Sequence, residues 1–220
     1  DNVNDSVLAM EIAKKLGCIK FIQVGTMEEA FTEKYLDLDY KTNNEYNRHV
    51  IYSVAKIAAK KALFLKSASL GIDLIYVLHS HVMGPDDDKD SFLQVTLQNL
   101  INGNDLIFSS GEQYFDVISP KDCAIGYYLI CKKGRVGETY WVGSGKPRKL
   151  KEYLEIMYEL YPSNKEMRFG ELPYNDIVLN PEDFSIENLT KDTGYVPAMS
   201  YEQTVIELYQ HLININKSLD

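Results

Sequence analysis

Apolar residues recur along this chain with two different spacings, which mark out helices and short buried strands. Through residue 16 they return every four positions, the spacing of one helix face, and Gly17 is placed to end that helix. Continuous apolar runs rich in β-branched residues, at 19–24 and 72–77, predict two buried strands. Between them, an Ala- and Lys-rich stretch from Arg48 to Leu70 predicts a long helix that ends before Gly71.

Downstream, the same two patterns continue in shorter pieces. They predict helices at 92–101, 120–131, 148–160 and 200–212, and strands at 106–108, 114–118 and 138–142. Residues 27–47 are polar and rich in tyrosine, so they predict a long surface loop of the kind that is often functional. The alternation of helices and strands indicates an α/β fold with a parallel sheet, whose sites lie at the carboxyl ends of the strands.

Length and composition limit the classes of function. The chain has 220 residues, 45% of them apolar, which is enough for a sizeable buried core. Its formal net charge of −9 is spread along the sequence and argues against a nucleic-acid partner. The sequence contains no apolar run near the roughly 20 residues that a membrane-spanning helix needs, and no signal-peptide pattern at its start. We therefore expect a cytoplasmic protein that has no membrane partner.

Cysteine and histidine do not point to a metal. Cys18, Cys123 and Cys131 lie among apolar neighbours in the sequence and lack paired metal-ligand spacing, so we predict buried free thiols. His79 and His81 alternate at the end of the second predicted strand, but no third ligand follows at a useful spacing. The sequence predicts no metal site.

Tyr52 and Lys56 are the strongest candidates for chemistry, because a spacing of four places them on one helix face. A tyrosine hydroxyl is a weak acid near neutral pH until a neighbouring cation stabilises its phenolate, and Lys56 is such a cation. The same Tyr-x-x-x-Lys spacing occurs at Tyr128/Lys132 and at Tyr161/Lys165. Only the first pair follows a strand that ends in a hydroxyl residue, Thr26, and it is therefore the predicted proton-transfer pair.

Several short segments occur in the order that is found in one enzyme family. They are VGTMEE at 24–29, YSVAKIAA at 52–59, HVMGP at 81–85, GEQYFD at 111–116, KD at 121–122, VGSGKPR at 142–148 and TGYVP at 193–197. This set resembles the extended short-chain dehydrogenase/reductase family, and most closely its NAD-dependent epimerase/dehydratase branch, which acts on nucleotide-linked sugars. Within that branch the chain is more similar to nucleotide-sugar 4-ketoreductases than to 4,6-dehydratases.

The resemblance implies roles for particular residues. Tyr52 would be the catalytic acid/base, Lys56 would activate it and hold the nicotinamide ribose, and Thr26 would bond the reacting oxygen. His79 and Ser80 would join Tyr52 and Lys56 in binding the cofactor. The implied substrate contacts are Glu29, His81 and Gln113, although the segment that Gln113 begins replaces an Arg-Asp-Phe type of sequence that usually clamps the diphosphate.

The resemblance also implies an architecture. We expect a partial Rossmann-type parallel sheet with helices on both faces over residues 1–160, interleaved with substrate-lobe segments at about 85–118. A small mixed α/β C-terminal lobe over residues 161–220 would bind the substrate. The implied cofactor is NAD or NADP, the implied partner is a nucleotide-linked sugar, and a homodimer is usual in the family.

One element of the family is missing from the sequence. Its members open with a strand, a Gly-rich turn and a helix that binds the cofactor pyrophosphate, and this chain has no such unit. Gly143 and Gly145 follow a strand, but Pro147 favours a helix-entry turn there. We therefore expect the C-terminal two-thirds of a longer enzyme, with an unpaired edge on the 19–24 strand. The alternative is a catalytically inactive fragment or a degenerate relative that serves binding or assembly.

Overall fold

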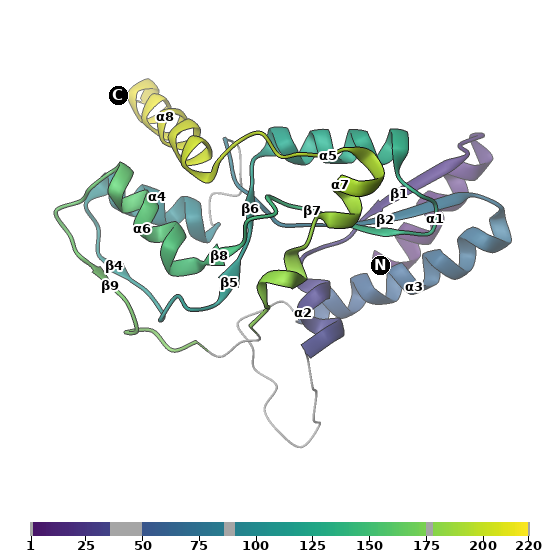
Figure 1. Cartoon of the computed structure of the whole chain (residues 1–220), viewed down its shortest axis with the longest axis horizontal. Helices are drawn as coiled ribbons and strands as arrows, with labels where there is room; N and C mark the ends of the chain where they lie inside the picture. The colour runs from purple at the N-terminus through teal and green to yellow at the C-terminus, as the bar shows by residue number, and fades with distance from the viewer. Residues whose placement is uncertain (1, 36–49, 86–90, 175–177, 220) are drawn as a thin grey trace, which may run out of the picture.

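A parallel sheet forms the centre of the computed structural model, which describes residues 2–35, 50–85, 91–174 and 178–219 (Figure 1). Its three strands lie in the order β1 (Lys20–Val24), β2 (Asp73–His79) and β7 (Thr139–Val142). In this register Val24 pairs with Val77, and His79 pairs with Val142. Since all three strands are parallel, their carboxyl ends meet at one edge of the sheet.

Helices cover both faces of this sheet, as expected for the α/β class (Figure 1). Alternate side chains of β2 point to opposite faces, because successive residues of a strand do so. Leu74 packs with helices α1 (Asn2–Lys15) and α3 (Val50–Leu70) on one face, whereas Ile75 and Val77 pack with α5 (Pro120–Lys133) and α7 (Glu187–Thr193) on the other. The predicted Rossmann-type α/β fold is thus confirmed, and β1 and β2 bring residues 25–26 and 79–80 side by side.

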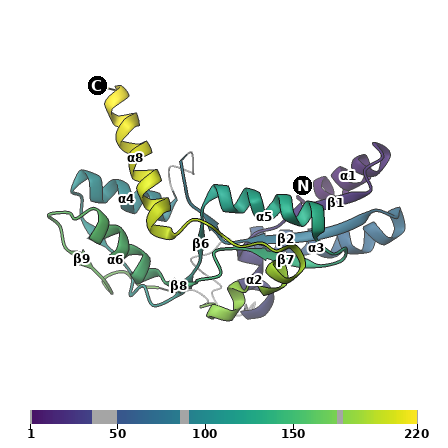
Figure 2. The ribbon, with the colours of Figure 1, turned by 45° about the horizontal axis from the view of Figure 1, so that its top comes forward.

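A second lobe lies beside the sheet and has its own apolar core (Figure 2). Three helices bury that core: α4 (Phe92–Asn102), α6 (Leu150–Leu160) and α8 (Tyr201–Leu219). Short strand pairs complete the lobe: β3 (His81–Val82) with β6 (Val117–Ile118), β4 (Leu106–Ile107) with β9 (Met167–Arg168), and β5 (Tyr114–Phe115) with β8 (Arg148–Lys149). Residues after 160 contribute to both parts, since α7 packs against β7 and α8 packs against α6.

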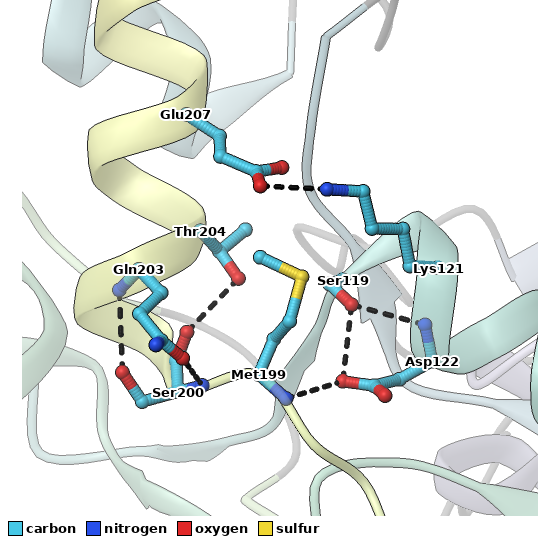
Figure 3. Close-up of polar contacts among 8 residues, drawn as sticks. All are labelled: Ser119, Lys121, Asp122, Met199, Ser200, Gln203, Thr204 and Glu207. Carbon is cyan, nitrogen blue, oxygen red and sulfur yellow. Dashed lines mark hydrogen bonds and ion pairs between the residues drawn. The ribbon is translucent and has the colours of Figure 1, made fainter.

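Asp122 fastens the C-terminal segment to the rest of the molecule (Figure 3). This carboxylate is buried and accepts hydrogen bonds from the hydroxyl of Ser119 at 3.1 Å and from the main-chain N–H groups of Ala198 and Met199, both at 2.9 Å. Two residues later α8 begins, with its first turn capped by Ser200. Asp122 therefore sets the position of the chain that leads into α8.

The structure corrects three sequence-based expectations. Residues 28–35, predicted as surface loop, form helix α2 (Glu28–Tyr35), while residues 36–49 lie outside the described part. The helix predicted from residue 148 begins at Leu150, because residues 148–149 pair as β8 with β5. Cys18 and Cys131 are exposed, and only Cys123 is buried as predicted. Ile130 next to Cys131 is fully buried, since neighbouring helix residues point about 100° apart.

The sequence also missed the short 3₁₀ helix η1 (Pro181–Phe184), which lies beside α2. Phe184 and Phe31 of α2 belong to one buried cluster with Trp141. Lys34 of α2 forms an ion pair with Asp183 of η1. Among the helices that the structure describes, none is both long and apolar enough to cross a membrane.

Candidate active site

The first part of the site is the turn that follows β1. Gly25 continues the strand ladder by donating its N–H to the carbonyl of Val77 at 2.8 Å. The N–H of Thr26 then donates to Oε1 of Glu29 at 2.9 Å, and the Thr26 hydroxyl accepts a long contact of 3.4 Å from the N–H of Glu28. The bond to Glu29 is one half of a capping box at the start of α2, for which the sequence signal is Thr-x-x-Glu, whereas the Thr26 hydroxyl accepts from Glu28 and not from Glu29. These contacts hold Thr26 at the carboxyl end of β1.

The second part is the predicted pair on the first two turns of α3. The Nζ atom of Lys56 lies 5.6 Å from the centre of the Tyr52 ring, as the spacing of four residues predicted. Tyr52 is 42% exposed, so it can be reached by a bound molecule. Helix α2 fixes this end of α3, because the Thr32 hydroxyl is hydrogen-bonded to the buried hydroxyl of Ser53. The pair therefore has a defined position relative to the turn at Thr26.

Glu29 links the two parts electrostatically. Its side chain is fully buried, and both of its carboxylate oxygens accept from the Tyr76 hydroxyl, Oε1 at 2.9 Å and Oε2 at 3.1 Å. Burial raises the pKa of Glu29, whereas the bonds from Thr26 and Tyr76 and the charges of Lys60 and Lys56 oppose that rise. Tyr76 also interacts electrostatically with Tyr52, and its own pKa is raised by burial first and by Glu29 next. The structure thus groups Thr26, Glu29, Tyr52 and Lys56 around the end of β1.

The predicted residues at the end of β2 have different surroundings. The Ser80 hydroxyl is completely buried, donates to Asp116 and accepts from Nε1 of Trp141 at 2.8 Å. Nδ1 of His79 is 2.9 Å from the carbonyl oxygen of Ser80, and the His81 ring centre is 5.6 Å from that of Phe115. Any cofactor contact at Ser80 would therefore come from its main-chain oxygen, because its side chain is occupied and its N–H donates to the carbonyl of Val142.

Asp116 is the polar residue that sequence reasoning missed. It is fully buried, and it accepts from the hydroxyls of Ser80 and Ser144 and, at 2.9 Å, from the N–H of Ser144. Burial raises the pKa of Asp116, and these hydrogen bonds act against that rise. A Cβ atom on Gly143 would lie 2.3 Å from Oδ2 of Asp116, so only glycine fits there. The sequence did contain one signal for a buried role of Asp116, because this acidic residue lies between two short apolar strands.

Gln113 lies in the second lobe, just before β5. Only 8% of it is exposed, and its main-chain oxygen accepts from the N–H of Leu150 at 2.9 Å. Within the described residues its side-chain oxygen is buried without a hydrogen-bond partner, which is costly for a polar atom. Such an atom suits a ligand contact, which is the role the sequence predicted.

The described residues hold no group of three or more His, Cys, Asp or Glu side chains that could bind a metal ion. A cavity of about 170 Å³ is lined by Ser144, Arg148, Tyr153 and Tyr201 among others. None of the predicted catalytic or binding residues lines it. We therefore locate the candidate site from the side-chain cluster at the strand ends and not from the cavity.

Comparison of the chain with known proteins gives consistent relatives. In sequence it is 24% identical over 191 residues to dTDP-glucose 4,6-dehydratase of Haemophilus influenzae, which covers 80% of this chain and 53% of that protein. It is 23% identical over 185 residues to a trifunctional UDP-glucose 4,6-dehydratase, epimerase and reductase of Arabidopsis thaliana, covering 80% of this chain and 27% of that protein. The chain spans about half the length of the dTDP-glucose 4,6-dehydratases that it matches.

Solved structures share the fold. UDP-glucuronic acid 4-epimerase of Bacillus cereus, in complex with UDP-glucuronic acid and NAD, superposes with a TM-score of 0.77 at 17% identity over 98% of this chain and 68% of that one. UDP-glucose 4-epimerase of Thermotoga maritima superposes with a TM-score of 0.77 at 18% sequence identity. This match covers 100% of this chain and 70% of that one. The sequence profile of the NAD dependent epimerase/dehydratase family matches residues 1–143, which is more than half of the chain. The chain therefore belongs to the NAD dependent epimerase/dehydratase family.

Proposed function

We propose that this chain carries the acid/base pair and the substrate lobe of an NAD(P)-dependent enzyme that acts at C4 of a nucleotide-linked sugar, as a 4-ketoreductase or a 4-epimerase. The observation that carries the proposal is the grouping of Tyr52, Lys56 and Thr26 at the carboxyl end of β1. Strand ends of this kind are where open α/β sheets bind their ligands. Relatives of the same fold are complexed with NAD or NADPH, and several with UDP-sugars.

The proposed roles follow from the chemistry of the side chains. Tyr52 passes a proton to or from the sugar oxygen, and Lys56 stabilises the phenolate that forms when the proton leaves. The Thr26 hydroxyl accepts only a long contact from Glu28, and its hydrogen can be donated to the same sugar oxygen. The nicotinamide cofactor, when bound, supplies and receives the hydride. The phenol of the exposed Tyr52 and the ammonium of the half-buried Lys56 also fit the ribose hydroxyls of such a cofactor.

Substrate contacts are proposed from the second lobe and from β3. The unpartnered, buried oxygen of Gln113 supports a hydrogen bond from a substrate hydroxyl or amide. His81 lies two residues after the end of β2 and is half-buried, which supports a contact with the sugar. Glu29, predicted as a third contact, already binds Thr26 and Tyr76, and this favours a supporting role.

A homodimer is part of the proposal, and the outer face of α3 supports it. Along that face Ile51, Val54 and Leu65 are exposed by 88%, 44% and 79%, and exposed Leu8 and Ile12 lie on the neighbouring helix α1. Exposed apolar side chains that gather on one helix face are typical of a protein interface. A second copy of the chain would cover it with the same apolar residues, as an isologous interface requires.

The sequence relatives favour one further reaction. The curated matches given above include 4,6-dehydratases, so dehydration of a nucleotide-sugar is the second candidate. It begins with the same oxidation at C4 and then loses water. The two candidates differ in their product, because only the dehydratase releases a 4-keto-6-deoxy sugar.

The test uses the full-length gene product with a panel of UDP- and dTDP-linked sugars and their 4-keto forms. Cofactor absorbance and the mass of the sugar product would be measured. We expect Tyr52→Phe to lower kcat by at least about 100-fold, the usual minimum for a general acid/base. Tyr128→Phe is the matched control, because Tyr128 has Lys132 at the same spacing on α5, with its Nζ 5.8 Å from the ring. Unchanged turnover in Tyr52→Phe would contradict the proposed function.

A further inference from the structure

Glu29 and Tyr76 form a buried pair directly beneath the turn that presents Thr26. The Tyr76 hydroxyl binds both carboxylate oxygens, and Oε1 binds the Thr26 N–H as well. Tyr76 belongs to β2 and Glu29 to α2, so the pair connects two elements that are 47 residues apart in the sequence. The turn after β1 is thereby attached to the neighbouring strand through side chains, at the point where the strand ladder has ended.

The burial of this pair is unusual for a helix cap. In a capping box the acidic residue normally lies in the first turn at the surface, whereas Glu29 and Tyr76 are both 0% exposed. Burying a carboxylate costs several kcal/mol unless it is hydrogen-bonded and faces opposite charge. Here two donors satisfy Glu29, the Thr26 N–H and the Tyr76 hydroxyl that both carboxylate oxygens share, and Lys56 and Lys60 provide the opposite charge. A helix cap alone does not require this arrangement.

The backbone of Gly25 passes close to the pair on one side. A Cβ atom on Gly25 would lie 2.2 Å from Oε1 of Glu29 and 2.7 Å from the Tyr76 hydroxyl oxygen. The glycine therefore lets the backbone close over the pair. On the other side the Nζ atom of Lys60 lies 5.2 Å from the centre of the Tyr76 ring, and Lys60 also pairs with Glu33 at 3.6 Å.

We infer that Glu29 is a positioning residue, whose buried carboxylate is fixed by the Tyr76 hydroxyl and holds the Thr26 amide so that the Thr26 hydroxyl faces the Tyr52/Lys56 pair. The effect on catalysis rests on the proposed function, whereas the anchoring of Thr26 does not. Because an error of about 1 Å in the placement of a catalytic group can cost on the order of 100-fold in rate, loss of the anchor would lower kcat.

The anchoring is tested by amide hydrogen exchange of this chain, followed by NMR. In Glu29→Ala we expect the Thr26 amide to exchange roughly tenfold faster, because its acceptor is gone. Tyr76→Phe should give a smaller increase, since the carboxylate stays but loses its fixed position. Glu33→Gln is the matched control on the same helix, because Glu33 makes ion pairs with Lys60 and Lys61. An unchanged Thr26 exchange rate in folded Glu29→Ala would overturn the inference.

A second variant keeps the test decisive. If Glu29→Ala does not fold, Tyr76→Phe carries the comparison, and a Thr26 exchange rate equal to wild type in that variant would overturn the inference that the Tyr76 hydroxyl fixes the anchor. In the full-length gene product, Glu29→Ala should lower kcat at least about tenfold with little change in KM. If Tyr52→Phe were fully active, the proposed function would fail, and the exchange rates would still decide whether Glu29 holds Thr26.

Discussion

The ammonium nitrogen of Lys56 lies 5.6 Å from the centre of the Tyr52 ring, almost the same separation as the 5.8 Å between Lys132 and the Tyr128 ring. The two pairs are thus equivalent in local geometry. They differ in their surroundings, since the first pair interacts with the buried Glu29 and Tyr76 at the end of β1. Because of this difference, we propose the catalytic acid/base role for Tyr52 and Lys56 on α3 and not for Tyr128 and Lys132 on α5.

Replacing Lys56 by methionine keeps most of the side-chain volume and removes its charge. We expect kcat of the full-length gene product to fall by about 100-fold or more, because the phenolate of Tyr52 loses its stabilising cation. Lys132→Met on α5 should leave kcat within about twofold. Steady-state kinetics on the best substrate of the panel would check both. Equal rates for the two variants would show that the surroundings of Lys56 have no catalytic meaning.

Glu29→Gln should change how stability depends on pH. The pKa of Glu29 is raised above its ordinary value of 4.5, mainly by burial and against the charges of Lys56 and Lys60 and the hydrogen bond from Tyr76. The folded protein therefore holds this proton to a higher pH than the unfolded chain does. The stability that this bound proton contributes is fully present below about pH 4.5, the ordinary pKa of the group. It is lost as the pH rises through the pKa that Glu29 has in the folded protein.

Urea unfolding between pH 4.5 and pH 8 would measure this effect. The difference in unfolding free energy between wild type and Glu29→Gln should shift in favour of the variant as the pH rises, since glutamine does not titrate. Glu33→Gln, which makes the same substitution at an exposed carboxylate of the same helix, is the matched control for the change of side chain. A difference between wild type and Glu29→Gln that is constant with pH would show that the buried carboxyl does not titrate in this range.

Asp116→Ala should destabilise the protein by about 2–4 kcal/mol. It would leave the hydroxyls of Ser80 and Ser144 and the N–H of Ser144 without their buried acceptor. Ser144→Ala removes one donor and leaves Asp116 bonded to Ser80, so it should cost less, about 1 kcal/mol. Thermal and urea unfolding would give both values. Similar costs for the two variants would mean that the network is not centred on Asp116.

Leu65→Glu should weaken self-association without lowering stability. Leu65 is 79% exposed on the outer face of α3, so a charge there remains solvated in the single chain but is buried in the proposed dimer. Sedimentation velocity should show a shift from dimer to monomer at micromolar concentration. Val196→Glu, at a site 70% exposed after α7, is the control and should not alter the association state. A wild-type chain that is monomeric throughout would refute the dimer.

The sequence by itself determined the fold class and the local geometry of the candidate pair. Helical spacing placed Tyr52 and Lys56 on one face, and the apolar runs before Thr26 and before His79 became adjacent parallel strands. These features depend on neighbours a few residues away, or on burial of a whole strand, and both leave a periodic pattern in the sequence. The pattern could not place residues 28–35 in α2, although Thr-x-x-Glu was a local signal for that helix.

Only the tertiary structure decided which polar groups are buried and what they bind. Glu29 looked like a loop acid, yet Tyr76 from β2 and the cations of α3 make its burial tolerable. Asp116 received its partners from the ends of β2 and β7, and Cys131 was exposed by the orientation of α5. Such outcomes depend on residues that are distant in sequence, because the cost of burying a polar group is set by the partners that folding brings to it.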